Sequence, residues 1–351
     1  MNDLEISFDL VIQDEASKAT PPEMALPMVY AKKSIVIGDH RQLPPMIDSN
    51  EFIQDIIAVA AKSKNNALYS KARDLAKQIK TNIDCFTVSH FERLYKNIHN
   101  SLKTAFDIQY RMHPSINEVI SQFYPIDPSR CEYGLSCGLD KKFVDEGDYD
   151  NPESRHHGIA IPGFIQPHHH IVWIDTTSPE VKLGTSRYNQ GEVQVVEKLL
   201  TKLSESDTYK VFEQHWKRAE EKQICLITFY GAQLFRLFQL RTKFPTLPLR
   251  ISTVDRFQGM ERNIIIVSTV RSDLLAISED QLPEQCESQL SMGFAEFPNR
   301  LNVALSRAKR LLIIVGNANH FSKERIYLNV LETIKQSPHG LYLNANDFIH
   351  L

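Results

Sequence analysis

The sequence has no long hydrophobic run. None of its apolar stretches approaches the roughly 20 residues that a membrane-spanning helix needs. The first ten residues, MNDLEISFDL, contain neither a basic start nor a long apolar core, so they do not predict a signal peptide. We therefore expect neither a membrane protein nor a secreted one.

Cysteine and net positive charge are also scarce. Five cysteines form an odd set without a repeating framework, which is typical of a reducing compartment. We predict a cytoplasmic protein, or a nuclear one if the source is eukaryotic. Lys and Arg number 40 against 43 Asp and Glu, which gives a net charge of -3. A broad basic face is therefore not expected, and any nucleic-acid surface would be a local cleft.

Two short apolar runs near the N-terminus each end in an acidic residue. Residues 10–12 lead to Asp14 and Glu15, and residues 35–37 lead to Gly38 and Asp39. Continuous apolar runs are typical of fully buried parallel strands, and open α/β sheets bind ligands beyond the carboxyl ends of such strands. The pattern predicts a site for a metal and a nucleotide. The alternative is a pair of core strands ending in solvated acids.

Strand and helix patterns alternate along the second half of the chain, which predicts an α/β fold with a parallel sheet. The predicted strands cover residues 171–175, 224–230, 251–254, 263–270 and 310–317. The predicted helices fall within 51–98, 115–124, 185–203, 207–222, 231–244 and 300–309. Residues 102–110 are expected to be extended, and Pro114 to open a helix.

Residues 125–170 are the least regular part of the chain. They contain Cys131, Cys137, His156, His157 and the run 168–170, which consists of three histidines. A metal site would combine these cysteines with some of the histidines, but their spacing matches no zinc pattern. We interpret the segment as a surface insertion.

Six blocks of sequence together resemble the ordered motifs of superfamily-one helicases of the Upf-like branch. They are DEAS, GDHRQLPP, QYRMHP, TFYGAQ, VDRFQGME and LNVALSRA. The resemblance covers nearly the whole chain. It implies two RecA-like parallel-sheet P-loop NTPase domains, of which the first is incomplete at its N-terminus. Residues 1–103 would be the C-terminal part of the first domain, and residues 104–351 the second domain, with the insertion at about 125–170.

The resemblance assigns the nucleotide chemistry to particular residues. Asp14 would hold Mg²⁺ and Glu15 would orient the attacking water, while Gln42 would sense the γ-phosphate of ATP. Two arginine fingers would stabilise the charge that develops on the phosphate. The fingers would be Arg111 and Arg307. Tyr110 would stack on the base, and Glu261 would accept a hydrogen bond from the ribose. Gly259 would permit a close approach of the backbone there.

The resemblance also implies contacts with single-stranded RNA or DNA. The expected residues are Pro44, Thr228, Ser252 and Thr253. Hydroxyls and strand-end amides touch phosphate and sugar without reading bases, so no sequence preference is expected. The family usually has proline where Phe229 stands, which weakens the assignment of Thr228. Movement would run 5'-to-3' by resemblance.

One motif of such helicases is missing from the sequence. The phosphate-binding loop, or Walker A loop, reads G-x-x-x-x-G-K-[ST], and none of the 13 glycines here is followed by lysine. We therefore expect the C-terminal part of a helicase motor that is inactive alone and relies on an upstream segment or chain with the loop. The alternative is a non-catalytic nucleic-acid-binding or interaction module derived from a helicase.

Overall fold

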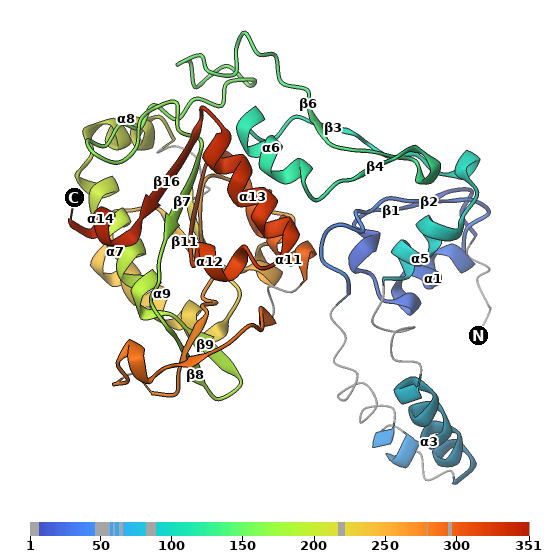
Figure 1. Cartoon of the computed structure of the whole chain (residues 1–351). Helices are drawn as coiled ribbons and strands as arrows, with labels where there is room; N and C mark the ends of the chain where they lie inside the picture. The colour runs from blue at the N-terminus through green and yellow to red at the C-terminus, as the bar shows by residue number, and fades with distance from the viewer. Residues whose placement is uncertain are drawn as a thin grey trace. The chain divides into compact units, whose positions relative to one another are not determined.

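The structure is a computed structural model that describes residues 7–45, 57–58, 60–62, 66–81, 89–216, 222–278, 280–293 and 297–350. The chain divides into two compact units, Met1–Thr104 and Ala105–Leu351. Each unit has its own sheet (Figure 1). Within the described residues, no helix is both long and apolar enough to cross a membrane.

Unit 1 is built on a pair of short strands. β1 (Val11–Gln13) and β2 (Ser34–Val36) pair in parallel, as predicted, with Ile12 opposite Ile35. The helices whose bounds the structure describes in this unit are α1 (Pro21–Val29), α3 (Asn66–Thr81) and α5 (His90–Asn97), with 3₁₀ turns η1 (Ala16–Lys18) and η2 (Asn100–Leu102). The rest of the predicted helical region 51–98 lies largely outside the described residues.

The prediction that both strands of unit 1 are fully buried is wrong. The side chain of Ile12 is 61% exposed and that of Ile35 is 49% exposed. The described core of this unit is small, because only Ala16, Met24 and Phe91 are buried together in it. A sheet of two strands that packs on so small a core leaves apolar side chains of both strands exposed to solvent.

Unit 2 contains a six-stranded sheet in which every pair of neighbours is parallel, as predicted. Its order is β11 (Leu249–Thr253), β10 (Ile224–Thr228), β12 (Arg262–Ser268), β15 (Ala308–Gly316), β7 (Ile171–Asp175) and β16 (Gly340–Asn344). β12 is buried at all seven positions, because helices cover both of its faces. Such burial explains the continuous apolar runs in the sequence.

Helices cover both faces of this sheet (Figure 1). On one face lie α7 (Gln190–Glu205), α8 (Asp207–Trp216), α9 (Gly231–Lys243) and α14 (Ala345–His350). Against the other lie α6 (Pro114–Ser121), α11 (Pro298–Leu305) and α13 (Arg325–Gln336). Two single-turn helices, α10 (Val254–Phe257) and α12 (Ala318–Phe321), follow β11 and β15. The main core joins alternate sheet residues to α7 and α9.

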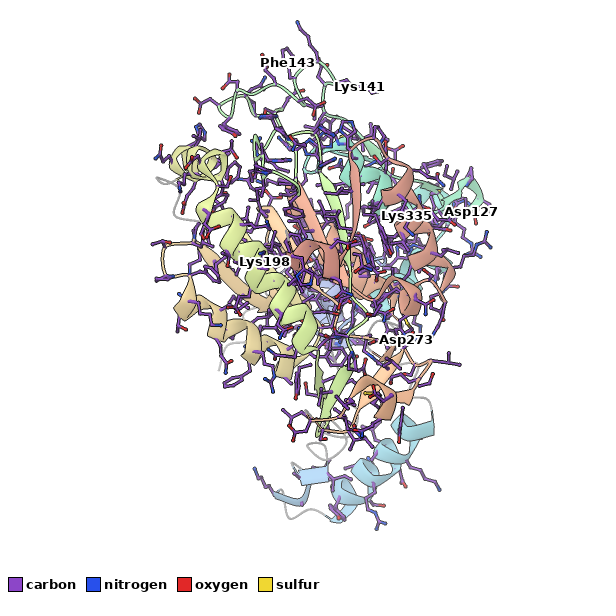
Figure 2. The ribbon with its side chains drawn as sticks, turned by 60° about the vertical axis from the view of Figure 1, so that its left-hand side comes forward. Asp127, Lys141, Phe143, Lys198, Asp273 and Lys335 are labelled. Carbon is purple, nitrogen blue, oxygen red and sulfur yellow. The ribbon has the colours of Figure 1, made fainter. Side chains whose placement is uncertain are left out.

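Smaller elements lie at the two ends of the strands. A second sheet combines β8 (Glu180–Leu183), β9 (Ser186–Tyr188), β13 (Leu274–Ala276) and β14 (Glu287–Ser288), with η4 (Pro283–Gln285) between the last two. The irregular region holds β4 (Ile126–Asp127), η3 (Pro128–Arg130), β5 (Glu132–Tyr133) and β6 (Ser136–Cys137). In Figure 2, Asp273 marks the end with the second sheet, and Lys141 and Phe143 mark the opposite end.

The approach to α6 differs in part from the prediction. Residues 102–110 were expected to be extended throughout, but Leu102 closes η2 and only β3 (Ile108–Gln109) is a strand, which pairs with β6. Pro114 does open α6, as predicted. The cap of that helix is His113, whose Nδ1 accepts a hydrogen bond from the backbone N–H of Ser115 at 3.1 Å.

Candidate functional site

The carboxylates of unit 1 follow β1 and β2 at the same edge of the strand pair. Asp14 and Glu15 are exposed. Asp14 Oδ1 accepts the backbone N–H of Glu15 at 2.8 Å, and the rest of that carboxylate faces solvent. Glu15 has a φ of 54°, in the left-handed region that residues other than glycine rarely adopt. Such strain persists where the surroundings enforce it, often at functional sites.

The donors at this edge fit a hard cation. Mg²⁺ prefers oxygen ligands and is usually held by one or two carboxylates together with substrate phosphates and water. Asp14 supplies an exposed carboxylate of this kind, and Glu15 stands beside it with Lys18 at 3.5 Å from its Oε2. Asp14 is therefore the residue of this edge that could hold the ion.

Gln42 is held by the acid that follows β2. Its Nε2 donates to Asp39 Oδ2 at 2.8 Å, and its backbone N–H donates to the Asp39 carbonyl at 3.1 Å. Asp39 Oδ1 accepts the backbone N–H of Arg41 at 2.8 Å. Asp39 therefore fixes the loop that carries Gln42, whereas Pro44 two residues further on is exposed.

Three distant motifs of unit 2 meet at Glu261. Arg111 Nε donates to Glu261 Oε2 at 2.6 Å, and the Arg111 Nη1 donates to the Ser306 carbonyl at 3.3 Å. Lys309 binds the other oxygen of the same carboxylate. Each of the three charged side chains is about one-third exposed, at 36% for Arg111, 35% for Glu261 and 36% for Lys309.

The charges of this cluster favour an anionic ligand. Burial raises the pKa of Glu261, but the ammonium of Lys309 and the guanidinium of Arg111 outweigh it and hold that pKa below its ordinary value. Glu261 is therefore ionised, and two cations share one anion. The excess positive charge on half-exposed, hydrogen-bonding groups suits phosphate oxygens.

The backbone that carries Arg111 is braced by a buried arginine. Arg155 Nε donates to the Arg111 carbonyl at 2.6 Å, and its Nη2 donates to the Tyr110 carbonyl at 2.7 Å. From the other side, Gln109 Oε1 accepts the backbone N–H groups of both Arg111 and Met112, at 2.7 Å each. The position of Arg111 is thus set before any ligand arrives.

Tyr110 presents its ring on the surface, with 62% of the residue exposed. The ring lies against Gly138, where an added Cβ would come within 2.5 Å of Tyr110 Cε1 and 2.6 Å of Ile108 Cγ2. Glycine is needed at this position to leave room for the ring. An exposed aromatic face so placed can stack on a planar ligand.

Arg307 differs from Arg111 in its surroundings. It is 2% exposed, and its Nε donates to the Val303 carbonyl at 2.9 Å. Its own carbonyl accepts the backbone N–H of Arg262 at 2.9 Å. Arg307 is thus adjacent in sequence to Ser306, which contacts Arg111, but in this structure its guanidinium is turned into the protein.

Gly259 lies in the turn that leads to Glu261. Among the described residues, no atom lies within 4 Å of a Cβ built at Gly259. The residue has a φ of 81° between α10 and β12. Glycine is required because a side chain in that conformation is strained, and the resulting turn brings Glu261 to the start of β12.

The predicted nucleic-acid residues of unit 2 lie at the carboxyl ends of neighbouring strands. Thr228 ends β10 and is in register with both Thr253 on β11 and Ser268 on β12. Thr253 is half-buried, whereas Ser252 is 6% exposed and Thr228 0%. Thr228 Oγ1 is buried without a hydrogen-bond partner among the described residues.

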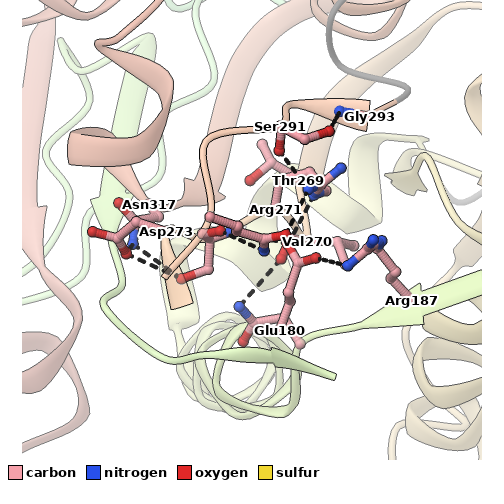
Figure 3. Close-up of polar contacts among 12 residues, drawn as sticks. Glu180, Arg187, Thr269, Val270, Arg271, Asp273, Ser291, Gly293 and Asn317 are labelled. Atoms are coloured by element: carbon pink, nitrogen blue, oxygen red, sulfur yellow. Dashed lines mark hydrogen bonds and ion pairs between the residues drawn. The ribbon is translucent and has the colours of Figure 1, made fainter. Parts of the chain in front are cut away.

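The carboxyl edge also holds an ionic network that the sequence did not reveal. Glu180 Oε2 accepts Arg271 Nε at 2.8 Å and the backbone N–H of Ser272 at 2.9 Å, and its Oε1 pairs with Arg187 (Figure 3). Arg271 also donates to the Ser291 carbonyl. Both Glu180 and Arg271 are buried, so the network ties the second sheet to the loop after β12.

A second buried acid at this edge has a strongly shifted pKa. Burial raises the pKa of Glu192 on α7 to about 8, against hydrogen bonds from Ser268 Oγ at 2.6 Å and from the Val270 N–H at 2.9 Å. Glu192 is therefore largely protonated at neutral pH. It fastens the first turn of α7 to the end of β12.

Comparison with known proteins places these motifs in a family. A protein-family model described as an AAA domain matches residues 86–319, and a second with the same description matches residues 1–50. The chain belongs to this family, in its Upf-like, superfamily-one helicase branch. The first model alone covers more than half of the chain and includes Arg111, Glu261 and Arg307.

Several Upf-like helicases are similar over almost the whole chain. The DNA replication ATP-dependent helicase/nuclease of Schizosaccharomyces pombe is 26% identical over 97% of this chain and 21% of its own length. Regulator of nonsense transcripts 1 of Dictyostelium discoideum is 29% identical over 93% of the chain and 20% of its length. An ATP-dependent helicase of Methanocaldococcus jannaschii is 26% identical, with 93% and 39% covered. The chain spans about a fifth to two fifths of these relatives.

Proposed function

We propose that this chain supplies the C-terminal part of the motor of an ATP-dependent helicase or translocase that acts on single-stranded RNA or DNA. The observation that carries the proposal is the contact of Arg111 with Glu261 and with the Ser306 carbonyl. These residues belong to QYRMHP, VDRFQGME and LNVALSRA, which lie far apart in the sequence. Their convergence gives a half-exposed cationic group suited to a nucleotide phosphate.

In the proposed reaction, Asp14 would hold Mg²⁺, Glu15 would orient the attacking water and Gln42 would sense the γ-phosphate. Such a metal ion neutralises phosphate charge during transfer. Arg111 and Arg307 act as the arginine fingers. The bond from Arg307 Nε to the Val303 carbonyl orients the guanidinium of the second finger.

Tyr110 and Glu261 are proposed to bind the nucleoside. The exposed ring of Tyr110 stacks on the base, and Glu261 accepts a hydrogen bond from the ribose. Because Glu261 already pairs with Arg111 and Lys309, a ribose hydroxyl at this carboxylate competes with those cations. Gly259 contributes through the turn that precedes Glu261.

Nucleic acid is proposed to contact the exposed Pro44 of unit 1 and the half-buried Thr253 of unit 2, with 5'-to-3' movement. Thr228 and Ser252 are buried beside Thr253 and support the strand ends there. Contacts of this kind reach phosphate and sugar, so binding is independent of base sequence.

Catalysis is proposed to depend on a further segment or chain that carries the phosphate-binding loop. Two observations support this proposal: the strands of unit 1 are exposed, and the chain covers only about a fifth of the length of two of its relatives. The sequence contains no glycine followed by lysine, and the loop needs that pair. The same absence favours the second candidate, a nucleic-acid-binding module without catalysis.

Fluorescence anisotropy with a labelled single-stranded oligonucleotide tests the binding half of the proposal. Thr253→Ala should weaken binding several-fold for unrelated base sequences alike, whereas Thr242→Ala, which alters an exposed threonine of α9, should not. Equal binding by both variants would remove β11 from the proposed surface. In a protein completed by the loop, Arg307→Ala should abolish turnover and spare this binding, and unwinding should require a 5' single-stranded tail.

A further inference from the structure

Three histidines from distant parts of unit 2 meet at the amino ends of its strands. His113 caps α6, His170 precedes β7 and His339 precedes β16. One ligand nitrogen from each lies within 4.8 Å of the others. His113 and His170 are buried, at 1% and 0% exposed. None of the three belongs to the proposed nucleotide or nucleic-acid residues.

Backbone carbonyls fix the tautomers of two of these rings. His170 Nδ1 donates to the Arg310 carbonyl at 2.6 Å, and His339 Nδ1 donates to the His168 carbonyl at 2.9 Å. The Nε2 atom of each ring then carries a lone pair. A metal-ligating histidine is oriented in this way, through a hydrogen bond from its other nitrogen to a carbonyl.

His170 Nε2 is buried and has no hydrogen-bond partner among the described residues. The nearest charged group to it is Asp145, whose Oδ1 lies at 3.6 Å. A lone pair and a carboxylate that face each other without a hydrogen between them repel, and a buried unpaired acceptor costs about 1–3 kcal/mol. A cation between the two groups would remove both penalties.

His113 completes the group. Its Nε2 lies 3.1 Å from Asp145 Oδ1, and its ring stacks on that of His170 with centroids 3.5 Å apart. Asp145 is 56% exposed on its side chain, which leaves a path from solvent to the cluster.

We propose that His113, His170, His339 and Asp145 form a binding site for a divalent transition metal, and that Zn²⁺ is its ion. Three imidazoles and one carboxylate match the tetrahedral nitrogen and oxygen set of zinc. Tetrahedral donors lie about 3.4 Å apart at a metal–nitrogen distance of about 2.1 Å. The three histidine nitrogens, which lie within 4.8 Å of one another, therefore move closer together on binding, and the two stacked rings tilt apart.

Binding requires one proton to move. In the metal-free cluster, His113 Nδ1 accepts the Ser115 N–H and its Nε2 carries the proton that faces Asp145. When Nε2 binds the metal, the proton moves through solvent to Nδ1, which then loses the hydrogen bond from the Ser115 N–H and donates to Ser115 Oγ at 2.9 Å. The site holds together the starts of α6, β7 and β16 and the segment around Asp145, so its role is structural.

The test uses the full 351-residue chain without a histidine tag. After metal removal, Co²⁺ should bind one ion per chain with the visible absorption of a tetrahedral site, and Zn²⁺ should displace it. His170→Ala and the less buried His339→Gln should each weaken Co²⁺ binding at least about tenfold. Asp145→Asn, at an exposed side chain, tests the fourth ligand with little risk to folding.

His168→Ala is the matched control, because it removes a neighbouring exposed imidazole and keeps the carbonyl that orients His339. It should bind Co²⁺ like the parent chain. Absence of a one-to-one cobalt spectrum from the parent would overturn the proposal, and so would equal affinity of His168→Ala and His339→Gln. Neither readout depends on ATP, so the proposed function stands or falls separately.

Discussion

Single side chains in unit 2 are positioned largely by backbone groups. Arg155 binds the carbonyls of Tyr110 and Arg111, and Gln109 binds the amide groups of Arg111 and Met112. These bonds fix the backbone that carries Arg111, whereas its guanidinium is oriented by Glu261 and the Ser306 carbonyl. The ion pair with Glu261 is about one-third exposed, and ion pairs open to solvent contribute about 0–1 kcal/mol.

Arg111→Lys should separate geometry from charge at this position. Lysine keeps the charge but lacks the planar, multiple donors of arginine. In a protein completed by the phosphate-binding loop, we expect kcat for ATP to fall by about 10³-fold or more while KM changes little. The control is Arg130→Lys, at a surface arginine that pairs with Asp127. Equal turnover by both variants would exclude Arg111 as a finger.

The buried hydroxyl of Thr228 gives a second prediction at this scale. Its Oγ1 has no hydrogen-bond partner among the described residues, so valine, which has the same shape, removes an unsatisfied group. Thr228→Val should raise the free energy of unfolding by about 1 kcal/mol, measured by urea denaturation. Affinity for single-stranded nucleic acid should change less than in Thr253→Ala. A destabilised variant would mean that Thr228 has a partner in solution.

At the scale of elements, the irregular region is attached to the motif that precedes α6. The Arg155 side chain is buried and donates to four carbonyls, those of Tyr110, Arg111, Pro152 and Ser154. It therefore joins residues 152–155 to the segment that carries Arg111.

Arg155→Ala should loosen this attachment. Hydrogen bonds to a charged group contribute about 1.5–3 kcal/mol, and the variant removes four of them at once, so we expect a loss of about 3 kcal/mol in the free energy of unfolding. Hydrogen exchange should increase at residues 109–112 before the central strands. Arg130→Ala should cost less than about 0.5 kcal/mol. Exchange that rises equally across the sheet would contradict a local role.

The sequence predicted elements best where burial is continuous. The runs that became β7, β10 and β12 are apolar because both faces of the sheet are covered, and the helices that follow Pro114 and Gly231 have clear starts. It failed for β1 and β2, because an apolar run does not reveal how many neighbours will cover it. Their exposure depends on packing, which a local pattern does not contain.

The Arg111–Glu261 cluster and the histidine cluster also differ in how far the sequence could predict them. The resemblance of two sequence blocks to helicase motifs led to Arg111 and Glu261, which the structure brings into contact. The histidine cluster could not be found from spacing, since its members lie at 113, 170 and 339 and meet only through the register of β7 and β16. The cysteines that a metal pattern would have used take no part in it. Arg155, Glu180 and Glu192 were missed because single charged residues carry no local signal.

For the whole molecule, pH should act on stability in two opposite ways. Burial raises the pKa of Glu192 from 4.5 to about 8. The contribution of protonated Glu192 to the free energy of unfolding is therefore fully present below pH 4.5 and is lost as the pH rises toward 8. Burial lowers the pKa of His113 from 6.5 to about 4, so its contribution is lost as pH falls from 6.5 to 4. Between pH 6.5 and 8, Glu192 dominates.

We therefore expect the free energy of unfolding to fall by up to about 1.4 kcal/mol per pH unit between pH 6.5 and 8, measured with a chelator present. Glu192→Gln, which cannot ionise, should remove most of this slope. The matched control is Glu197→Gln on the same helix, at a partly exposed residue that pairs with Lys243. The account of Glu192 fails if the parent and Glu192→Gln show the same slope.

Unit 1 carries the proposed Mg²⁺-binding and water-orienting carboxylates, and unit 2 carries the cationic cluster around Glu261. Our central claim is the proposal that this set is incomplete for catalysis without a phosphate-binding loop. ATP hydrolysis by the purified 351-residue chain, with and without single-stranded nucleic acid, tests that claim most directly. We predict nucleic-acid binding without stimulated turnover. Turnover that rises with single-stranded nucleic acid and disappears in Glu15→Gln would contradict it.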